Sequence, residues 1–241
     1  LILKKQAWVP STVTGGQDTV GLRMPGHPVA LELLRRFAAV AGEHAGIAAP
    51  SANRFGRISP TTAAHVQEEL GERIQLILDG GPCKVGIEST IVDCSRNEPV
   101  VLRPGHIAPA HLEAVLGRQP AIETASGAPR VSGSLAAHYA PQTPMRLIAG
   151  QRLLDYLNAQ RHKGDRCGVI GHSQPPQAGM PHLWRMLPAD PVGYARDLYA
   201  ALREMDQAGV SAIVVESLPE ETAWAAVTDR LRRAVAGSGQ S

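Results

Sequence analysis

Short apolar runs alternate with stretches of helical spacing along the first half of the chain. After Pro28, which suits a first helical turn, apolar residues recur at helical spacing as far as Val40. The short apolar runs are bounded by Gly and Pro, as the strands of a sheet domain are. We expect helices to begin at His27, within 59–62 and at Ala108, and strands over residues 1–9, 19–24, 47–50, 74–78, 90–94 and 100–103, with the strand at 47–50 buried.

The second half repeats this alternation after a linker. Residues 119–133 hold several Pro and Gly residues with small polar residues between them, and the segment that follows ends in His138-Tyr139-Ala140-Pro141. An apolar stripe at helical spacing runs from Tyr194 to Met205. We expect strands over residues 145–148, 167–170 and 212–216, and helices over 151–159, 192–207 and 222–235. This order predicts an α/β protein with a small parallel sheet in its second half.

Composition favours a globular protein with an aliphatic core. The chain has 241 residues, of which 44% are hydrophobic and only 4% aromatic. The formal net charge is +2, and the basic residues are too scattered to indicate a nucleic-acid-binding surface. The three cysteines, Cys83, Cys94 and Cys167, form no CxxC pair, which fits a reducing compartment. The sequence contains no run of about 18 apolar residues, so it predicts no membrane span. We therefore expect a cytoplasmic protein.

Four polar clusters follow predicted strands or turns between Ile47 and Ile107. They are Ser51-Ala52-Asn53, Ser59-Pro60-Thr61, residues 86–90 and Leu102-Arg103-Pro104-Gly105. Hydroxyls, an amide and an arginine at strand ends suit an anionic ligand such as a nucleotide phosphate. Arg23 ends another predicted strand, and its planar guanidinium suits a carboxylate or a phosphate.

These polar residues also have structural interpretations. Ser and Asn are common residues of Ser and Asx turns, so Ser51 and Asn53 could simply form a turn. Ser59 before Pro60 is by default a helix N-cap. Glu88 has no second carboxylate paired with it, so it is more often a structural acceptor than a general base, and glycosidase chemistry is poorly supported. His138 is more often structural than catalytic. The sequence has neither a clear Ser-His-Asp order nor the clustered Cys and His of a zinc site.

The ordered set of motifs resembles the Sua5/YrdC family of threonylcarbamoyl-AMP synthases, in its longer Sua5 form. The matching segments are residues 19–25, 48–53, 59–61, 78–81, 86–91 and 102–105. The linker ending in His138-Tyr139-Ala140-Pro141 and the α/β unit after it extend the likeness over nearly the whole chain. The resemblance implies a YrdC-like twisted mixed sheet with helices over residues 1–118, a linker or lid over 119–144, and a small Rossmann-like parallel-sheet Sua5 domain over 145–241.

The resemblance also implies a reaction. Threonine and bicarbonate form a carbamate that attacks the α-phosphate of ATP, which gives threonylcarbamoyl-adenylate and pyrophosphate for the t6A modification of tRNA. Mg²⁺ is expected to arrive with ATP, and RNA or tRNA-modification proteins are further expected partners. Such a site works by positioning substrates and stabilising charge, so we assign no catalytic nucleophile and no metal ligand of the protein.

The family's site residues can be carried over by position. The expected ATP contacts are Thr19, Ser51, Asn53, Ser59 and Arg103, with Ser132 in a lid that folds over the nucleotide. Arg23 is expected to hold the threonine carboxylate, while Ser89 and the backbone of Ala49 line the threonine pocket.

The chain departs from the family pattern in two places. Members of the family carry an upstream part with a Lys-x-Arg motif, a threonine-binding Thr and a His. This part is not found ahead of Leu1, so we expect a fragment of a longer protein or a truncated gene product. The linker reads Val131-Ser132-Gly133-Ser134 where many members have Ser-Pro-Gly-Met. An alternative hypothesis is therefore a nucleotide- or RNA-binding module without synthase activity. A carbamoyltransferase-type enzyme with a YrdC-like domain fits less well, because its zinc-finger cysteines are not evident.

Overall fold

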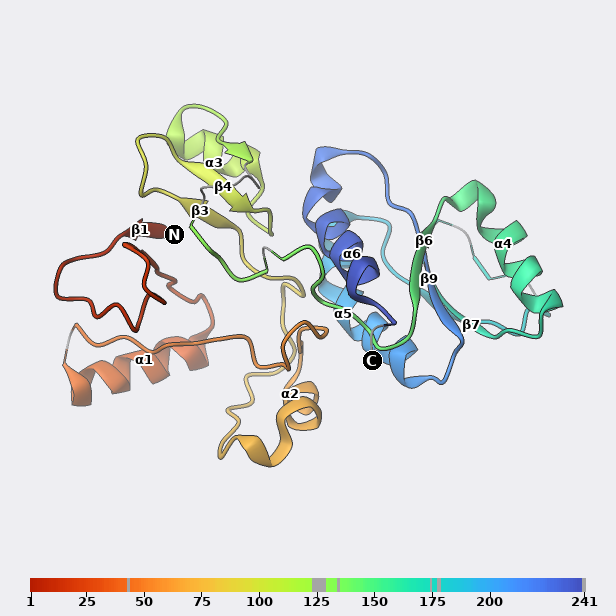
Figure 1. Cartoon of the computed structure of the whole chain (residues 1–241), viewed down its shortest axis with the longest axis horizontal. Coiled ribbons are helices and arrows are strands. Elements are labelled where there is room, and N and C mark those ends of the chain that lie inside the picture. The colour runs from red at the N-terminus through yellow and green to blue at the C-terminus, as the bar shows by residue number, and fades with distance from the viewer. Residues whose placement is uncertain (43, 123–128, 134, 174, 177–178, 240–241) are drawn as a thin grey trace.

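The fold consists of two sheets, one in each half of the chain (Figure 1). It is known from a computed structural model, which describes residues 1–42, 44–122, 129–133, 135–173, 175–176 and 179–239. The parts of the predicted linker at 123–128 and at Ser134 lie outside the described residues. Within the described ranges, no helix combines the length and the apolar character needed to cross a membrane.

The first half of the chain builds a mixed five-stranded sheet in the order β2-β1-β3-β4-β5. The strands are β1 (Ile2–Lys4), β2 (Thr19–Gly21), β3 (Ile91–Asp93), β4 (Val100–Arg103) and β5 (Ala121–Ile122). The pairs β1–β2 and β3–β4 are antiparallel, whereas β1–β3 and β4–β5 are parallel. The predicted mixed sheet is therefore confirmed.

The helices of the first half begin close to where the sequence places them. They are α1 (Pro28–Ala41), α2 (Ala63–Leu70), the short 3-10 helix η1 (Gly71–Arg73) and α3 (Pro109–Leu116). The ring of His27 caps α1 by accepting a hydrogen bond from the Val29 amide, and Pro28 occupies the first turn. Helix α3 ends at Gly117, whose left-handed φ of 74° favours glycine.

Three expectations for the first half are wrong. Residues 47–50 and 74–78 form no strand in the described structure, and they are mostly exposed. A short apolar run becomes a strand only where a neighbouring strand pairs with it, and neither run has such a partner among the described residues. Ser59 is not the N-cap of α2, because the helix begins later and the hydroxyl of Thr62 accepts from the His65 amide.

The second half builds a parallel four-stranded sheet in the order β6-β9-β7-β8. The strands are β6 (Met145–Ile148), β7 (Cys167–Gly171), β8 (Leu183–Met186) and β9 (Ala212–Glu216). This confirms the small parallel sheet, and the bounds of β6 and β9 agree with those predicted. Strand β8 was not predicted, because this edge strand carries a charged Arg185 and no fully buried residue.

Helices cover both faces of the parallel sheet. They are α4 (Gly150–His162), α5 (Pro191–Gln207), the 3-10 helix η2 (Thr222–Trp224) and α6 (Ala225–Gly237). Figure 1 shows α5 and α6 between this sheet and the first half of the chain, with α4 on the far face. The predicted stripe of α5, from Tyr194 to Met205, is fully buried.

The largest buried cluster joins the two halves. It contains residues of α5, α6 and the parallel sheet, and it also takes in Ile58 and Ile87 from the first half and Tyr139 from the linker. A shared apolar core fixes the two halves against each other, because separating them would expose buried apolar surface to water. The division at residues 118 and 144 stays a prediction.

Candidate functional site

A cavity of about 1080 Å³ opens beside the mixed sheet and collects five of the predicted site residues. Its lining comes from β1, β2, β3, the end of β4 and the linker, segments that are far apart in sequence. The predicted residues in it are Thr19, Arg23, Ser89, Arg103 and Ser132. The structure therefore brings together residues expected to contact ATP and residues expected to contact threonine.

Arg23 is available to a ligand. It lies just after β2, is exposed, and lines the cavity. No carboxylate or carbonyl among the described residues holds its guanidinium by a hydrogen bond or an ion pair. A guanidinium can hold a carboxylate through two parallel hydrogen bonds, so this position suits the predicted role toward the threonine carboxylate.

Arg103 is held in place by backbone carbonyls. Its side chain is buried, and its Nε and Nη2 donate to the carbonyl oxygen of Ser89 at 3.1 and 2.9 Å. Its Nη1 donates to the carbonyl oxygen of Ser132 at 2.8 Å. Burial is the main cause that lowers the pKa of Arg103. Arginine has five N–H donors, so Arg103 can tie two walls of the cavity together and still offer donors to an anion.

The other four predicted residues lie outside this cavity. Ala49 and Ser51 are exposed on the segment before α2. The side-chain Nδ2 of Asn53 donates to the backbone carbonyl oxygens of Arg54 at 2.9 Å and Arg57 at 3.2 Å, which agrees with a turn. Ser59 donates its hydroxyl to Glu88 at 2.6 Å. Their roles toward ATP and threonine stay predictions.

Glu88 is the centre of a buried polar network that the sequence interpretation missed. Its carboxylate accepts from Ser59, from the Tyr199 hydroxyl at 2.9 Å and from Arg230 Nε at 3.0 Å. Burial by itself raises the pKa of Glu88, but the Arg230 charge and the Ser59 hydrogen bond outweigh burial, so that the pKa is lowered. Glu88 is thus a structural acceptor, which is the more common role that the sequence left open.

The linker passes through the same network at Tyr139. This buried residue has a φ of 61°, which lies in the left-handed region of the backbone that residues other than Gly, Asn and Asp rarely adopt. Its ring stacks on Tyr199 at 5.7 Å between centroids, and the Arg230 guanidinium lies 5.5 Å from the ring centroid. The neighbouring backbone is held from both halves, because the His138 amide donates to the carbonyl oxygen of Arg233 and the Ala140 amide donates to the carbonyl oxygen of Gly56.

His138 itself packs rather than reaching into the cavity. Its ring contacts Tyr139 at 4.2 Å between centroids and Phe55 at 6.3 Å. Burial is the main cause that lowers the pKa of His138. These contacts agree with the structural role that the sequence favours for this histidine.

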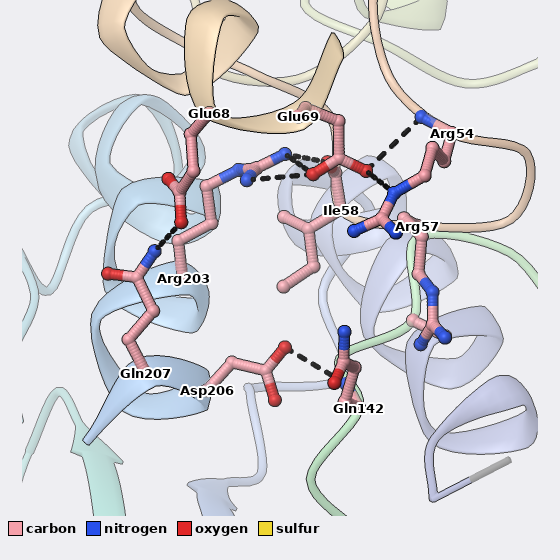
Figure 2. A pocket seen from close by; sticks show the side chains of 10 residues that line it. Arg54, Arg57, Ile58, Glu68, Glu69, Gln142, Arg203, Asp206 and Gln207 are labelled. Carbon is pink, nitrogen blue, oxygen red and sulfur yellow. Dashed lines mark hydrogen bonds and ion pairs between the residues drawn. The ribbon is translucent and has the colours of Figure 1, made fainter. Parts of the chain in front are cut away.

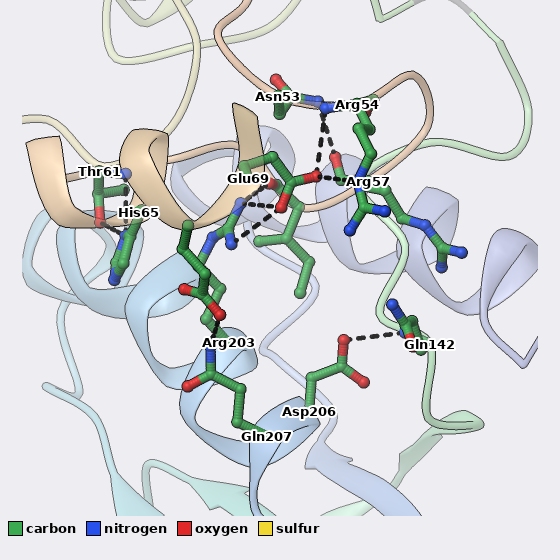
Figure 3. Close-up of polar contacts among 12 residues, drawn as sticks. Asn53, Arg54, Arg57, Thr61, His65, Glu69, Gln142, Arg203, Asp206 and Gln207 are labelled. Carbon is green, nitrogen blue, oxygen red and sulfur yellow. Dashed lines mark hydrogen bonds and ion pairs between the residues drawn. The ribbon is translucent and has the colours of Figure 1, made fainter. Parts of the chain in front are cut away.

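A second polar cluster joins α2 to α5 beside a small cavity of about 160 Å³ (Figure 2). Glu69 accepts from Arg203 Nη1 at 3.3 Å and from Arg54 Nε at 3.4 Å. Figure 3 shows the same carboxylate between these two arginines, with Asp206 next to the linker residue Gln142. No predicted site residue lines this cavity, and its carboxylates are matched by arginines, amides or backbone N–H groups. We interpret it as a contact between the halves.

The described residues offer no metal centre. Within them, no group of three or more His, Cys, Asp or Glu side chains could hold a metal ion. Of the residues that the structure describes, those with charged side chains that line the larger cavity are Arg23, Arg103 and Arg130. Three positive charges suit the phosphates and carboxylates of ligands.

Comparison with known proteins identifies the family. A family model described as "Telomere recombination", which covers the Sua5, YciO and YrdC proteins, matches residues 1–105. A second model, "Threonylcarbamoyl-AMP synthase, C-terminal domain", matches residues 107–236. The chain therefore belongs to the Sua5/YrdC family of threonylcarbamoyl-AMP synthases, in the form that carries the Sua5 C-terminal domain.

Individual relatives are similar along almost all of the chain. The threonylcarbamoyl-AMP synthase of Pyrococcus abyssi is 36% identical, and the match covers 97% of this chain and 69% of that protein. The threonylcarbamoyl-AMP synthase of Bacillus subtilis is 36% identical over 93% of this chain and 65% of its own length. The crystal structure of P. abyssi Sua5 complexed with L-threonine superposes with a TM-score of 0.82 at 34% identity, over 98% of this chain and 69% of that chain.

Proposed function

We propose that this chain supplies the ATP- and threonine-binding walls of a threonylcarbamoyl-AMP synthase. The observation that carries the proposal is the larger cavity, where Thr19, Arg23, Ser89, Arg103 and Ser132 come together from separate segments. The similar P. abyssi protein has a crystal structure in complex with L-threonine, which supports a threonine site in this fold.

The proposed reaction needs positioning more than a protein nucleophile. Threonine nitrogen bonds to the carbon of bicarbonate, whose hydroxyl leaves as water with a proton from the amine, and a carbamate forms. A carbamate oxygen then bonds to the α-phosphorus of ATP, and the bond from that phosphorus to the bridging oxygen breaks as pyrophosphate leaves. Arg23 would hold the threonine carboxylate, and the remaining N–H donors of Arg103 would face phosphate oxygens. Two substrates held in this way react faster because their relative motion is already restricted, and fixed positive charge stabilises the phosphorus centre.

Magnesium is proposed as a companion of ATP. Mg²⁺ in nucleotide sites is commonly held by phosphate oxygens and water with few protein ligands. The arginines of the cavity would bind phosphate oxygens and not a cation, so the metal would be held by the phosphates and by water. When bound, the metal would neutralise phosphate charge.

The remaining parts of the proposal concern the setting of the reaction. The adenylate would serve the t6A modification of tRNA, with tRNA-modification proteins or RNA as further partners. The free cysteines Cys83, Cys94 and Cys167 support a reducing, cytoplasmic location.

Pyrophosphate release tests the proposal. The wild-type chain is incubated with Mg-ATP and bicarbonate, with and without L-threonine, and pyrophosphate is measured. The proposal expects release that depends on threonine, and release independent of threonine would contradict it. ATP binding in a calorimeter without any turnover would support the alternative of a binding module.

A further inference from the structure

The loop that brings Ser89 to the cavity rests on helix α5 of the C-terminal half. A Cβ at Gly86 would lie 2.2 Å from the carbonyl oxygen of Arg196 and 2.3 Å from that of Ala195. No side chain fits at such a distance, so only glycine lets the loop backbone approach the helix this closely. The adjacent Ile87 is buried in the core that the two halves share.

Glu88 anchors the next residue of the loop to the same half. Tyr199 of α5 and Arg230 of α6 are fully buried and donate to one carboxylate oxygen, and Arg230 Nη2 also donates to the Glu88 carbonyl oxygen at 3.3 Å. Hydrogen bonds to a charged group in a buried place are stronger than those between neutral groups at the surface. The network therefore holds the backbone as well as the side chain of Glu88.

Ser89 connects this anchor to the cavity. Its carbonyl oxygen accepts two hydrogen bonds from Arg103, while Ser89 and Arg103 both line the cavity. The loop also packs closely against the backbone of Gly105, because a Cβ at Gly105 would lie 2.3 Å from the Thr90 nitrogen. A shift of Glu88 would therefore be passed to both cavity residues.

We propose that Tyr199 and Arg230 are positioning residues for the amino-acid substrate. They act through Glu88, which fixes the Ser89 loop and with it the guanidinium of Arg103. This inference rests on the proposed function for the identity of the substrate. It gives the C-terminal half a defined task in the site although none of the described residues of that half lines the larger cavity.

The test compares two tyrosine variants of the same helix. Tyr199→Phe removes the hydroxyl that holds Glu88 and keeps the ring that stacks on Tyr139. Tyr194→Phe is the matched control, because that buried hydroxyl has no hydrogen-bond partner among the described residues. Calorimetry with L-threonine and with ATP on the full chain is expected to show threonine binding weakened in Tyr199→Phe by up to about tenfold, which is the limit if the whole strength of the lost hydrogen bond to Glu88 is passed to the site. ATP affinity should also fall in Tyr199→Phe, because the same loop holds the Arg103 guanidinium that would face the phosphates, and Tyr194→Phe should match the wild type.

A third variant separates positioning from general stability. Leu157→Ala opens the core between α4, to which Leu157 belongs, and the other face of the parallel sheet, away from Glu88. Threonine binding is expected to be unchanged in Leu157→Ala when measured well below the unfolding temperature. Equal losses in Leu157→Ala and Tyr199→Phe, or no loss in Tyr199→Phe, would overturn the proposal.

Hydrogen exchange distinguishes failure of this inference from failure of the proposed function. If the wild type binds no threonine, the proposed function is contradicted, and with it the substrate named here. The positioning claim is then judged on the amides of residues 86–90, which should exchange faster in Tyr199→Phe than in Tyr194→Phe. Equal exchange in the two variants would show that Tyr199 does not hold the loop.

Discussion

Glu88 and Arg230 form an ion pair of 3.0 Å although 142 residues separate them in the sequence. The pair joins the loop before β3 to helix α6, and the arginine is fully buried. This contact between the two halves thus lies one residue away from Ser89, a lining residue of the cavity. Stability of the interface and geometry of the site should therefore change together.

The ion pair predicts a large loss of stability when one partner is removed. Arg230→Met leaves the Glu88 carboxylate buried without its counter-charge, and such a loss costs about 3–5 kcal/mol of unfolding free energy. The double variant Glu88→Gln/Arg230→Met removes both charges and should recover part of that loss. Urea unfolding at pH 7 measures both values. A double variant as unstable as the sum of the two single variants would mean that the residues do not interact.

The same carboxylate predicts how stability depends on pH. Arg230 and Ser59 outweigh the effect of burial and lower the pKa of Glu88 in the folded state. A carboxyl of this kind stabilises the fold above its unfolded pKa, about 4.3, and the stabilisation is lost as the pH falls through the folded pKa. The difference in unfolding free energy between wild type and Glu88→Gln should be largest at pH 7 and should shrink below about pH 4. A difference that stays constant from pH 7 to pH 3 would contradict this assignment.

Gly86 predicts a steric effect at the interface. In Gly86→Ala the new Cβ would overlap carbonyl oxygens of α5, and overpacking of this kind costs about 1–3 kcal/mol. Gly46→Ala is the matched control, since a Cβ there meets nothing within 4 Å. Thermal unfolding of both variants makes the comparison. Equal midpoints would show that the loop can move away from α5 without cost.

Much of the fold could be predicted because its elements carry strong local signals. Strands β6 and β9 have the expected bounds, and the stripe of α5 from Tyr194 to Met205 is buried as its spacing indicates. The expected strands at 47–50 and 74–78 are wrong because an apolar run of four or five residues does not state which strand it pairs with. Strand formation depends on that partner as much as on the run itself.

The site shows the same limit. The resemblance named Glu88 as part of a motif, but nothing local to the motif indicated Tyr199 or Arg230, which lie 111 and 142 residues away. Likewise Ser59 sits before Pro60 as an N-cap would, yet its hydroxyl is used by Glu88 across 29 residues. Contacts of this range are set by packing of the two halves, which a single sequence does not state.

Arg23 predicts a selective effect on substrate binding. Arg23→Ala removes an exposed guanidinium of the cavity that would hold the threonine carboxylate, so threonine binding should weaken by at least about tenfold, as for a lost charged hydrogen bond. ATP binding should change much less. Arg36→Ala on α1 is the control, because Arg36 is exposed and pairs only with its neighbour Glu32 among the described residues. Equal losses for threonine and ATP would contradict the role given to Arg23.

Direct titration of the wild-type chain with L-threonine, in parallel with Arg23→Ala, decides whether the cavity is a substrate site. We expect saturable heat with the wild type and a marked loss in Arg23→Ala, with both proteins folded by circular dichroism. A folded wild-type chain that gives no heat with threonine, or an Arg23→Ala variant that binds threonine as well as the wild type, would contradict the assignment of the cavity.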